Sequence, residues 1–125
     1  MGVPVSAPGW IAVGLLGGVA AGARFAIDAE ITARARSPFP FGILAVNLAG
    51  ALALGIVAGA ALHGEALAIV AGGGIGSFTT FSTWILDSHR LRGAGRGDLA
   101  LLNVGLSLVA GFAAVALGHW LGGAL

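Results

Sequence analysis

The chain has 125 residues, of which 58% are hydrophobic and only 9% are charged, and it contains no cysteine. A soluble domain carries about 25% charged residues, so the composition excludes an ordinary soluble domain and indicates an integral membrane protein. The net charge of +1 is too small to indicate a nucleic-acid-binding surface. We treat residues 1–125 as a single membrane domain, since the chain is too short to divide.

Apolar runs separated by polar or proline-containing loops predict four membrane-spanning helices. The expected spans cover about residues 10–32, 41–62, 66–87 and 98–121. Ser37-Pro38-Phe39-Pro40 separates the first two, because a residue that precedes proline is disfavoured in helical geometry. Four spans place both termini on the same side of the membrane. The sequence therefore predicts an all-α integral membrane fold.

The third span contains the most unusual stretch of the chain, Gly72 to Trp84, which reads GGGIGSFTTFSTW. Each glycine weakens a helix interior by roughly 1 kcal/mol relative to alanine, and glycines dominate the start of this stretch. Backbone groups released at membrane depth must be buried in protein or line a polar cavity. We therefore expect the third span to be broken at about residues 72–79, with a functional site at the break.

Small residues recur every four positions in the first two spans. The first set is Gly14, Gly18 and Gly22, and the second is Ala51, Gly55 and Gly59. This spacing lets helices approach closely in lipid. Because four short helices enclose little interior of their own, we expect these small residues to pack against a second subunit.

Positive charge is confined to one end of the expected bundle. The second loop and both tails carry no Lys or Arg, and all six basic residues lie in or beside the first and third loops: Arg24, Arg34, Arg36, Arg90, Arg92 and Arg96. Cytoplasmic loops carry the excess of positive residues. We expect a multi-pass plasma-membrane protein with loops 1 and 3 in the cytoplasm and both termini outside.

Polar and aromatic side chains near the break are candidates for an ion pathway. A polar stripe at helical spacing follows the break: Thr80, Thr83 and Asp87. Phe81 and Trp84 lie three residues apart on one face, and Asn47 is the strongly polar residue of the second span. Hydroxyls, an amide and positively polarised ring edges suit a small, strongly hydrated anion. Ordinary interhelical hydrogen bonds and back-bonding to carbonyls four residues earlier are the alternative.

Three motifs in the chain point to one family. GGGIGSFTTFSTW is accompanied by VNLAG (Val46 to Gly50) in the second span and by GGVAAGARF (Gly17 to Phe25) in the first. Together they resemble the Fluc/CrcB fluoride channels over essentially the whole chain, and TTFST after a glycine cluster is the most specific part. The resemblance implies a fluoride-selective channel that lets F⁻ leave the cytoplasm passively and so limits fluoride toxicity. It also implies an antiparallel dimer with two pores and a central structural Na⁺.

The resemblance also implies roles for particular residues. Gly76 and Thr79 match the positions whose backbone carbonyls hold the sodium ion. With the polar stripe included, the expected fluoride pathway consists of Asn47, Phe81, Trp84, Thr80, Thr83, Ser107 and Asp87. Three positions depart from the family pattern, one of them being Ala20, where the first-span motif often has glycine. Trp84 replaces a phenylalanine, which keeps a positive ring edge but adds an N–H donor, and Asn103 stands where a tyrosine is common.

Other interpretations stay open. A dual-topology homodimer needs little positive bias, whereas this chain is strongly biased, so the second Fluc-type subunit is either another copy or an oppositely oriented homologue. A non-conducting or half-active subunit of a heterodimer is the main alternative. A small four-span multidrug or cation transporter needs a membrane-buried carboxylate, but the acidic residues lie at or near span ends. An enzyme is not expected, because the histidines show no metal-ligand spacing.

Overall fold

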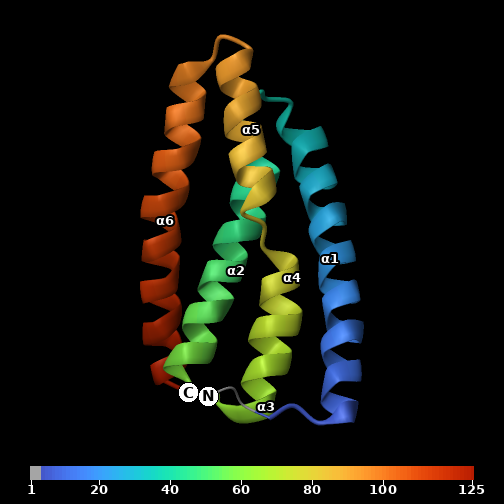
Figure 1. Cartoon of the computed structure of the whole chain (residues 1–125). Coiled ribbons are helices and arrows are strands. Elements are labelled where there is room, and N and C mark those ends of the chain that lie inside the picture. Colours follow the sequence, from blue (N-terminus) through green and yellow to red (C-terminus); the bar gives the residue numbers. More distant parts are fainter. Residues whose placement is uncertain (1–3) are drawn as a thin grey trace.

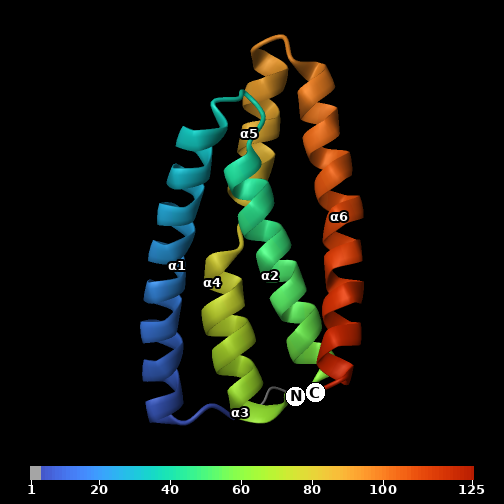
Figure 2. The same cartoon turned by 180° about the vertical axis from the view of Figure 1, so that it is seen from behind.

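The computed structural model describes residues 4–125, which form a bundle of long helices (Figures 1 and 2). Within that range, four helical stretches are long and apolar enough to cross a membrane. Three of them are continuous helices: α1 (Ala7–Ala35), α2 (Phe41–Gly59) and α6 (Gly97–Gly123). The four-span all-α prediction is confirmed, and α1 extends the expected first span at both ends.

The third span is interrupted, but the glycines do not interrupt it. Its first half is wound continuously as α3 (Gly64–Leu67), η1 (Ala68–Ile75) and α4 (Gly76–Phe78), and its second half is α5 (Ser82–Gly93). Gly72, Gly73 and Gly74 thus lie within a π-helix, η1, and remain helical. Thr79 is extended, with φ −85° and ψ 161°. The predicted break exists, and the non-helical residues are 79–81.

Close packing against α1 explains why the glycines stay helical. A Cβ at Gly73 would come within 3.0 Å of both Cα and the carbonyl oxygen of Val13. A Cβ at Gly74 would lie 3.1 Å from the Leu16 side chain. The absence of side chains thus lets the η1 backbone lie directly on α1, and this contact offsets the poor helix propensity of glycine.

The helices α2 and α6 make the other close contact of the bundle. A Cβ at Gly55 would collide with the Val115 carbonyl oxygen, and a Cβ at Gly118 would collide with the Leu52 carbonyl oxygen. By contrast, a Cβ added to any of the three predicted small residues of α1 would meet no atom within 4 Å; these are Gly14, Gly18 and Gly22. The expected contact with a second subunit is therefore wrong for Gly55 and Gly59, which pack against α6 of the same chain, whereas the α1 set faces open space.

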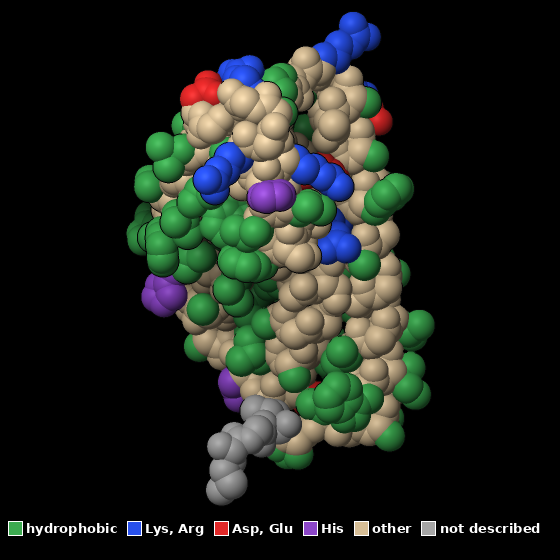
Figure 3. Space-filling view, turned by 45° about the horizontal axis from the view of Figure 1, so that its top comes forward, with side chains coloured by type: hydrophobic (Ala, Val, Ile, Leu, Met, Phe, Trp, Pro, Cys, Tyr) green, Lys and Arg blue, Asp and Glu red, His purple; other side chains and the backbone are tan. Residues whose placement is uncertain are grey.

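The two ends of the bundle differ in charge. The start of α1 and the end of α6 lie at the end opposite the α1–α2 and α5–α6 connections (Figure 1). Arginine side chains gather towards the end formed by those two connections (Figure 3).

The interior is small, because the buried hydrophobic side chains are only Phe39, Ile43, Val46 and Leu91 among the described residues.

Two glycine-to-alanine changes on α6 test the α2–α6 contact. We expect Gly118→Ala to destabilise the protein by about 1–3 kcal/mol, because the new methyl group meets the α2 backbone. Gly105→Ala, whose new methyl group would have no atom within 4 Å, should be neutral or stabilise the helix by up to about 1 kcal/mol. Thermal unfolding in detergent measures both. Equal midpoints for the two variants would contradict the close approach.

Candidate functional site

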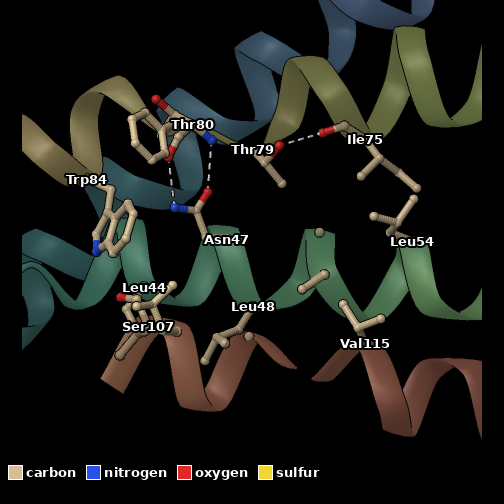
Figure 4. Close-up of a pocket in the computed structure, with 15 residues that line it drawn as sticks. Leu44, Asn47, Leu48, Leu54, Ile75, Thr79, Thr80, Trp84, Ser107 and Val115 are labelled. Carbon is tan, nitrogen blue, oxygen red and sulfur yellow. Dashed lines mark hydrogen bonds between the residues drawn. The ribbon is translucent and has the colours of Figure 1, made fainter. Parts of the chain in front are cut away.

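A side-chain amide from α2 takes up the backbone groups that the break leaves free. The N–H of Thr80 donates to Oδ1 of Asn47 at 2.8 Å, and Nδ2 of Asn47 donates to the Thr80 carbonyl at 2.9 Å (Figure 4). Hydrocarbon offers no such partner, so Asn47 stabilises the break at membrane depth. An amide NH₂ has two hydrogens. One N–H of Asn47 is therefore left for another acceptor.

Threonine hydroxyls complete the local hydrogen bonding. Oγ1 of Thr79 donates to the Ile75 carbonyl at 3.0 Å, which is the back-bonding expected of a threonine at a helix end. Oγ1 of Thr80 accepts the N–H of Thr83 at 3.2 Å and lies 3.1 Å from the Thr83 hydroxyl. Thr80, one residue before the N-cap Phe81, thereby pairs a backbone N–H in the first turn of α5, as capping side chains do.

These alternative hydrogen bonds leave backbone carbonyls before the break without their helical donors. In an uninterrupted α-helix, the carbonyl of Gly76 would accept from Thr80 N–H and that of Thr79 from Thr83 N–H. Those two N–H groups donate to Asn47 and to the Thr80 hydroxyl instead. Gly76 and Thr79, the two residues expected to hold sodium, are therefore among the residues before the break whose carbonyls lose their ordinary helical donors; no backbone bond to the carbonyls of Ser77 and Phe78 crosses the break either.

Arg24 contacts the break, and the sequence analysis did not predict this contact. It lies inside α1 and its Nη1 is 3.5 Å from the Thr79 carbonyl oxygen. The sequence grouped it with the arginines in or beside the first loop. Its position within the GGVAAGARF motif was the only signal available, because the contact joins residues 55 positions apart. A cation thus lies beside a carbonyl that the break has freed.

A cavity of about 320 Å³ opens at the break, between the third span, α2 and α6. It brings together six of the expected site residues: Asn47, Thr79, Thr80, Phe81, Trp84 and Ser107 (Figure 4). Its other lining residues are aliphatic side chains or glycine, and no residue that lines it is ionisable. The walls therefore carry hydrogen-bond donors without formal charge.

Thr83 and Asp87 lie outside this cavity. They line a second cavity of about 450 Å³, which also contains Asp28, Thr32 and Arg90. The hydrogen bond between the Thr80 and Thr83 hydroxyls joins the walls of the two cavities. The carboxylate of Asp87 lies 3.8 Å from the Arg90 guanidinium. Gly76 lines neither cavity.

The aromatic pair is packed edge to face. The ring centroids of Phe81 and Trp84 are 5.4 Å apart, with an interplanar angle of 70°. Phe81 is 72% exposed in the single subunit, so most of its ring is free to meet another partner. Trp84 is partly buried, and its indole N–H donates to the Asn103 carbonyl at 3.3 Å. The indole N–H, which we expected to be an extra donor in the pathway, is therefore bonded to α6.

The arrangement defines the protein as a polytopic membrane protein with a neutral, donor-lined cavity at a broken spanning helix. Hydroxyl and amide donors without a charge can hold an anion weakly enough for it to leave. General acid–base catalysis needs a positioned titratable group, and none lines the first cavity. Within residues 4–125, no three His, Cys, Asp or Glu side chains gather as a metal site.

Comparisons with known proteins identify the family. The family described as "CrcB-like protein, Camphor Resistance (CrcB)" matches residues 11–119. A Mycobacterium tuberculosis protein named "Fluoride-specific ion channel FluC 2" is 42% identical over 112 residues, which cover 90% of this chain and 89% of the relative. The chain belongs to the CrcB family.

Two relatives come from one organism, Symbiobacterium thermophilum. The protein named "Fluoride-specific ion channel FluC 2" is 47% identical over 115 residues, which cover 83% of this chain and 94% of the relative. The protein named "Fluoride-specific ion channel FluC 1" is 39% identical over 119 residues, which cover 90% of this chain and 96% of the relative. Both relatives are similar to this chain over nearly their whole length.

Replacing Asn47 tests its role at the break. Asn47→Leu keeps the approximate volume but leaves the Thr80 N–H and carbonyl without partners, and each such group costs about 1–3 kcal/mol. We expect a loss of stability of at least about 2 kcal/mol, measured by thermal unfolding in detergent. Ser107→Ala is the control, because it removes a hydroxyl from the same cavity and no bond to the backbone. Equal small losses would show that the Asn47 bonds contribute little.

Proposed function

We propose that the chain is a subunit of a fluoride-selective channel that lets F⁻ leave the cytoplasm passively. The observation that carries this proposal is the uncharged cavity at the break, with its donors from α2, the third span and α6. The names of the relatives support the choice of fluoride. Fluoride is the smallest and most strongly hydrated halide, so it needs close donors that replace its water.

The donors of the cavity suit transient binding. Asn47 has one amide N–H that its bonds to Thr80 leave free. The Phe81 ring has a positively polarised edge and is largely exposed. Conduction requires sites that bind strongly enough to admit an ion but weakly enough to release it. Donors without a fixed positive charge meet that requirement.

The path continues from the first cavity to the second through the threonine hydroxyls. The Thr80 and Thr83 hydroxyls lie 3.1 Å apart, so an ion can pass from one donor to the next. Asp87 lies at the far side, where its negative charge would oppose an anion. Arg90, 3.8 Å away, offsets part of that repulsion. In the expected orientation this end faces the cytoplasm.

A second subunit completes the pathway in this proposal, in an antiparallel arrangement. Phe81 is 72% exposed in one subunit, and the α1 glycines face open space. An aromatic ring that lines an ion path needs a wall opposite it. The family resemblance and the small interior of the single chain support a dimer in which a partner provides that wall.

The freed carbonyls fit a central sodium ion. Sodium is a hard cation that prefers oxygen ligands, and the carbonyls of Gly76 and Thr79 have lost their helical donors to Asn47 and Thr80. Two antiparallel subunits would supply four such oxygens. The ion would then offset their partial negative charges in place of backbone N–H groups. Arg24 donates to the Thr79 carbonyl at 3.5 Å in the single chain, so its guanidinium would have to share that oxygen with the ion or move away from it.

A heterodimer is the second candidate assembly. The arginine bias favours one orientation of insertion, so an antiparallel partner would be an oppositely oriented homologue. The occurrence of two relatives, named FluC 1 and FluC 2, in one organism is consistent with paired subunits. In that assembly this chain would contribute a half-active or non-conducting pore. A multidrug or cation transporter is disfavoured, because no carboxylate lines the first cavity.

Fluoride efflux tests the function. Liposomes loaded with potassium fluoride and containing the purified chain should release fluoride rapidly when valinomycin is added. Phe81→Ala should slow this release by about tenfold or more, because the ring edge no longer faces the ion. Phe112→Ala is the matched control, since this phenylalanine is 74% exposed and lies outside both cavities. No release from folded, dimeric wild-type protein would contradict a self-sufficient channel.

Reporter fusions test the orientation. A C-terminal alkaline phosphatase should be active and a C-terminal green fluorescent protein dark, because the arginine-bearing loops are retained in the cytoplasm. Replacing Arg90, Arg92 and Arg96 by glutamine should let part of the chains insert the other way. Comparable activity of both reporters on the wild-type chain would contradict the need for an oppositely oriented homologue.

A further inference from the structure

A closed set of hydrogen bonds joins α5 to α6 beside the first cavity. The Ser88 hydroxyl donates to the Trp84 carbonyl at 3.0 Å, and Nδ2 of Asn103 donates to the Ser88 hydroxyl oxygen at 2.8 Å. The indole N–H of Trp84 donates back to the Asn103 carbonyl at 3.3 Å. Asn103 is only 1% exposed. These bonds fix the register of Trp84 against α6.

The position of Trp84 decides which part of its ring meets the cavity. Tryptophan has a single donor, the indole N–H, and the Asn103 carbonyl holds it. The ring also packs edge to face against Phe81. Trp84 lines the cavity with its N–H already bonded elsewhere. The ring therefore offers the cavity carbon-bound hydrogens and no strong donor.

Ser107 is another residue of the first cavity that contacts Asn103. Its hydroxyl lies 3.5 Å from Oδ1 of Asn103, whereas good O–H···O bonds measure about 2.5–3.0 Å. A bond this long is weak, so the hydroxyl can turn to a better acceptor at little cost. An anion in the cavity is such an acceptor, because hydrogen bonds to charged groups are about twice as strong as neutral ones.

We propose that Asn103 is a positioning residue that decides which donors of Trp84 and Ser107 an anion meets. Its side-chain amide, through Ser88 and the Trp84 main-chain carbonyl, ties α5 to α6 and so keeps the indole N–H against the main-chain carbonyl of Asn103. Its Oδ1 holds the Ser107 hydroxyl weakly until an anion takes it. A fixed indole N–H in the cavity would retain larger halides as well, whereas one turning hydroxyl beside ring edges favours a small ion. This inference rests on the proposed fluoride function for its transport readout.

The test compares Asn103→Leu with the wild-type chain. The substitution keeps the approximate volume but removes the donor to Ser88 and the acceptor of Ser107. We expect the ratio of fluoride to chloride efflux from liposomes to fall by about tenfold. We also expect the emission of Trp84 to shift, because the Asn103 side chain no longer ties α5 to α6. The shift is measured in a Trp10→Phe, Trp120→Phe background, and these two substitutions should be tolerated because both residues are exposed.

Two further variants separate positioning from packing. Ile43→Ala removes a side chain that is 4% exposed and lies outside both cavities, so it should lower the melting temperature without changing the efflux ratio. Ser88→Ala breaks the link to Trp84 but leaves the contact with Ser107, so it should shift the Trp84 emission and lower the ratio less. It also keeps the test decisive if Asn103→Leu does not fold.

The outcomes distinguish the two proposals. If Asn103→Leu and Ser88→Ala lower only the melting temperature, as Ile43→Ala does, Asn103 has a packing role alone and the inference is overturned. If the wild-type chain passes no fluoride, the proposed function fails. The Trp84 emission of the same variants still decides, in that case, whether the Asn103 side chain positions the indole, because the main-chain carbonyl that accepts the indole N–H is unchanged.

Discussion

The paired hydrogen bonds between the Asn47 side chain and the Thr80 backbone are the constraint on which the rest of the site depends. They satisfy an N–H and a carbonyl that would otherwise be unpaired at membrane depth. Because Thr80 N–H goes to Asn47, the Gly76 carbonyl loses its helical donor. Because the Thr80 hydroxyl caps α5, the Thr79 carbonyl loses its donor as well. Asn47 of α2 thus maintains the break, and together with the Thr80 hydroxyl it leaves carbonyls beside the break without their helical donors.

The neutrality of the first cavity follows from where the chain places its charges. The arginines of the loops lie at one end of the bundle, and Asp87 lines the second cavity with Arg90. Arg24 brings a positive charge near the break, and it faces a carbonyl oxygen. The first cavity is left with an amide, hydroxyls and ring edges. Under the proposed function, such a wall would bind an anion through dipoles and release it without breaking an ion pair.

In the proposed channel, a single chain does not complete the pathway. Its tight contacts are those between η1 and α1 and between α2 and α6, where glycines let backbones meet. The α1 glycines face open space, and Phe81 extends from the break with most of its ring exposed. The interior of one subunit is therefore used to hold the break, and its outer faces are left for lipid or a partner.

The sequence predicted the fold well because spans depend on local properties. Apolar length and charge-poor composition determine whether a segment crosses a membrane, and the loops follow from proline, glycine and arginine. The exact break was harder to predict. The glycines indicated residues 72–79, yet Gly73 and Gly74 stay helical because the α1 backbone lies against them. The interruption falls at 79–81, where Asn47 captures a backbone 33 residues away.

The candidate site was likewise predictable from the sequence only in part. The residue types around TTFST indicated an anion path, and the structure places six of the expected residues around one cavity. Whether they conduct fluoride, and whether Gly76 and Thr79 hold sodium, stay predictions. The sequence could not show that α6 takes the Trp84 N–H or that Arg24 reaches Thr79.

By itself the sequence determined the four spans, the broken third span and the charged end, since these depend on composition along the chain. Only the tertiary structure decided which backbone groups are freed and which donors face the cavity, because those depend on partners from other helices.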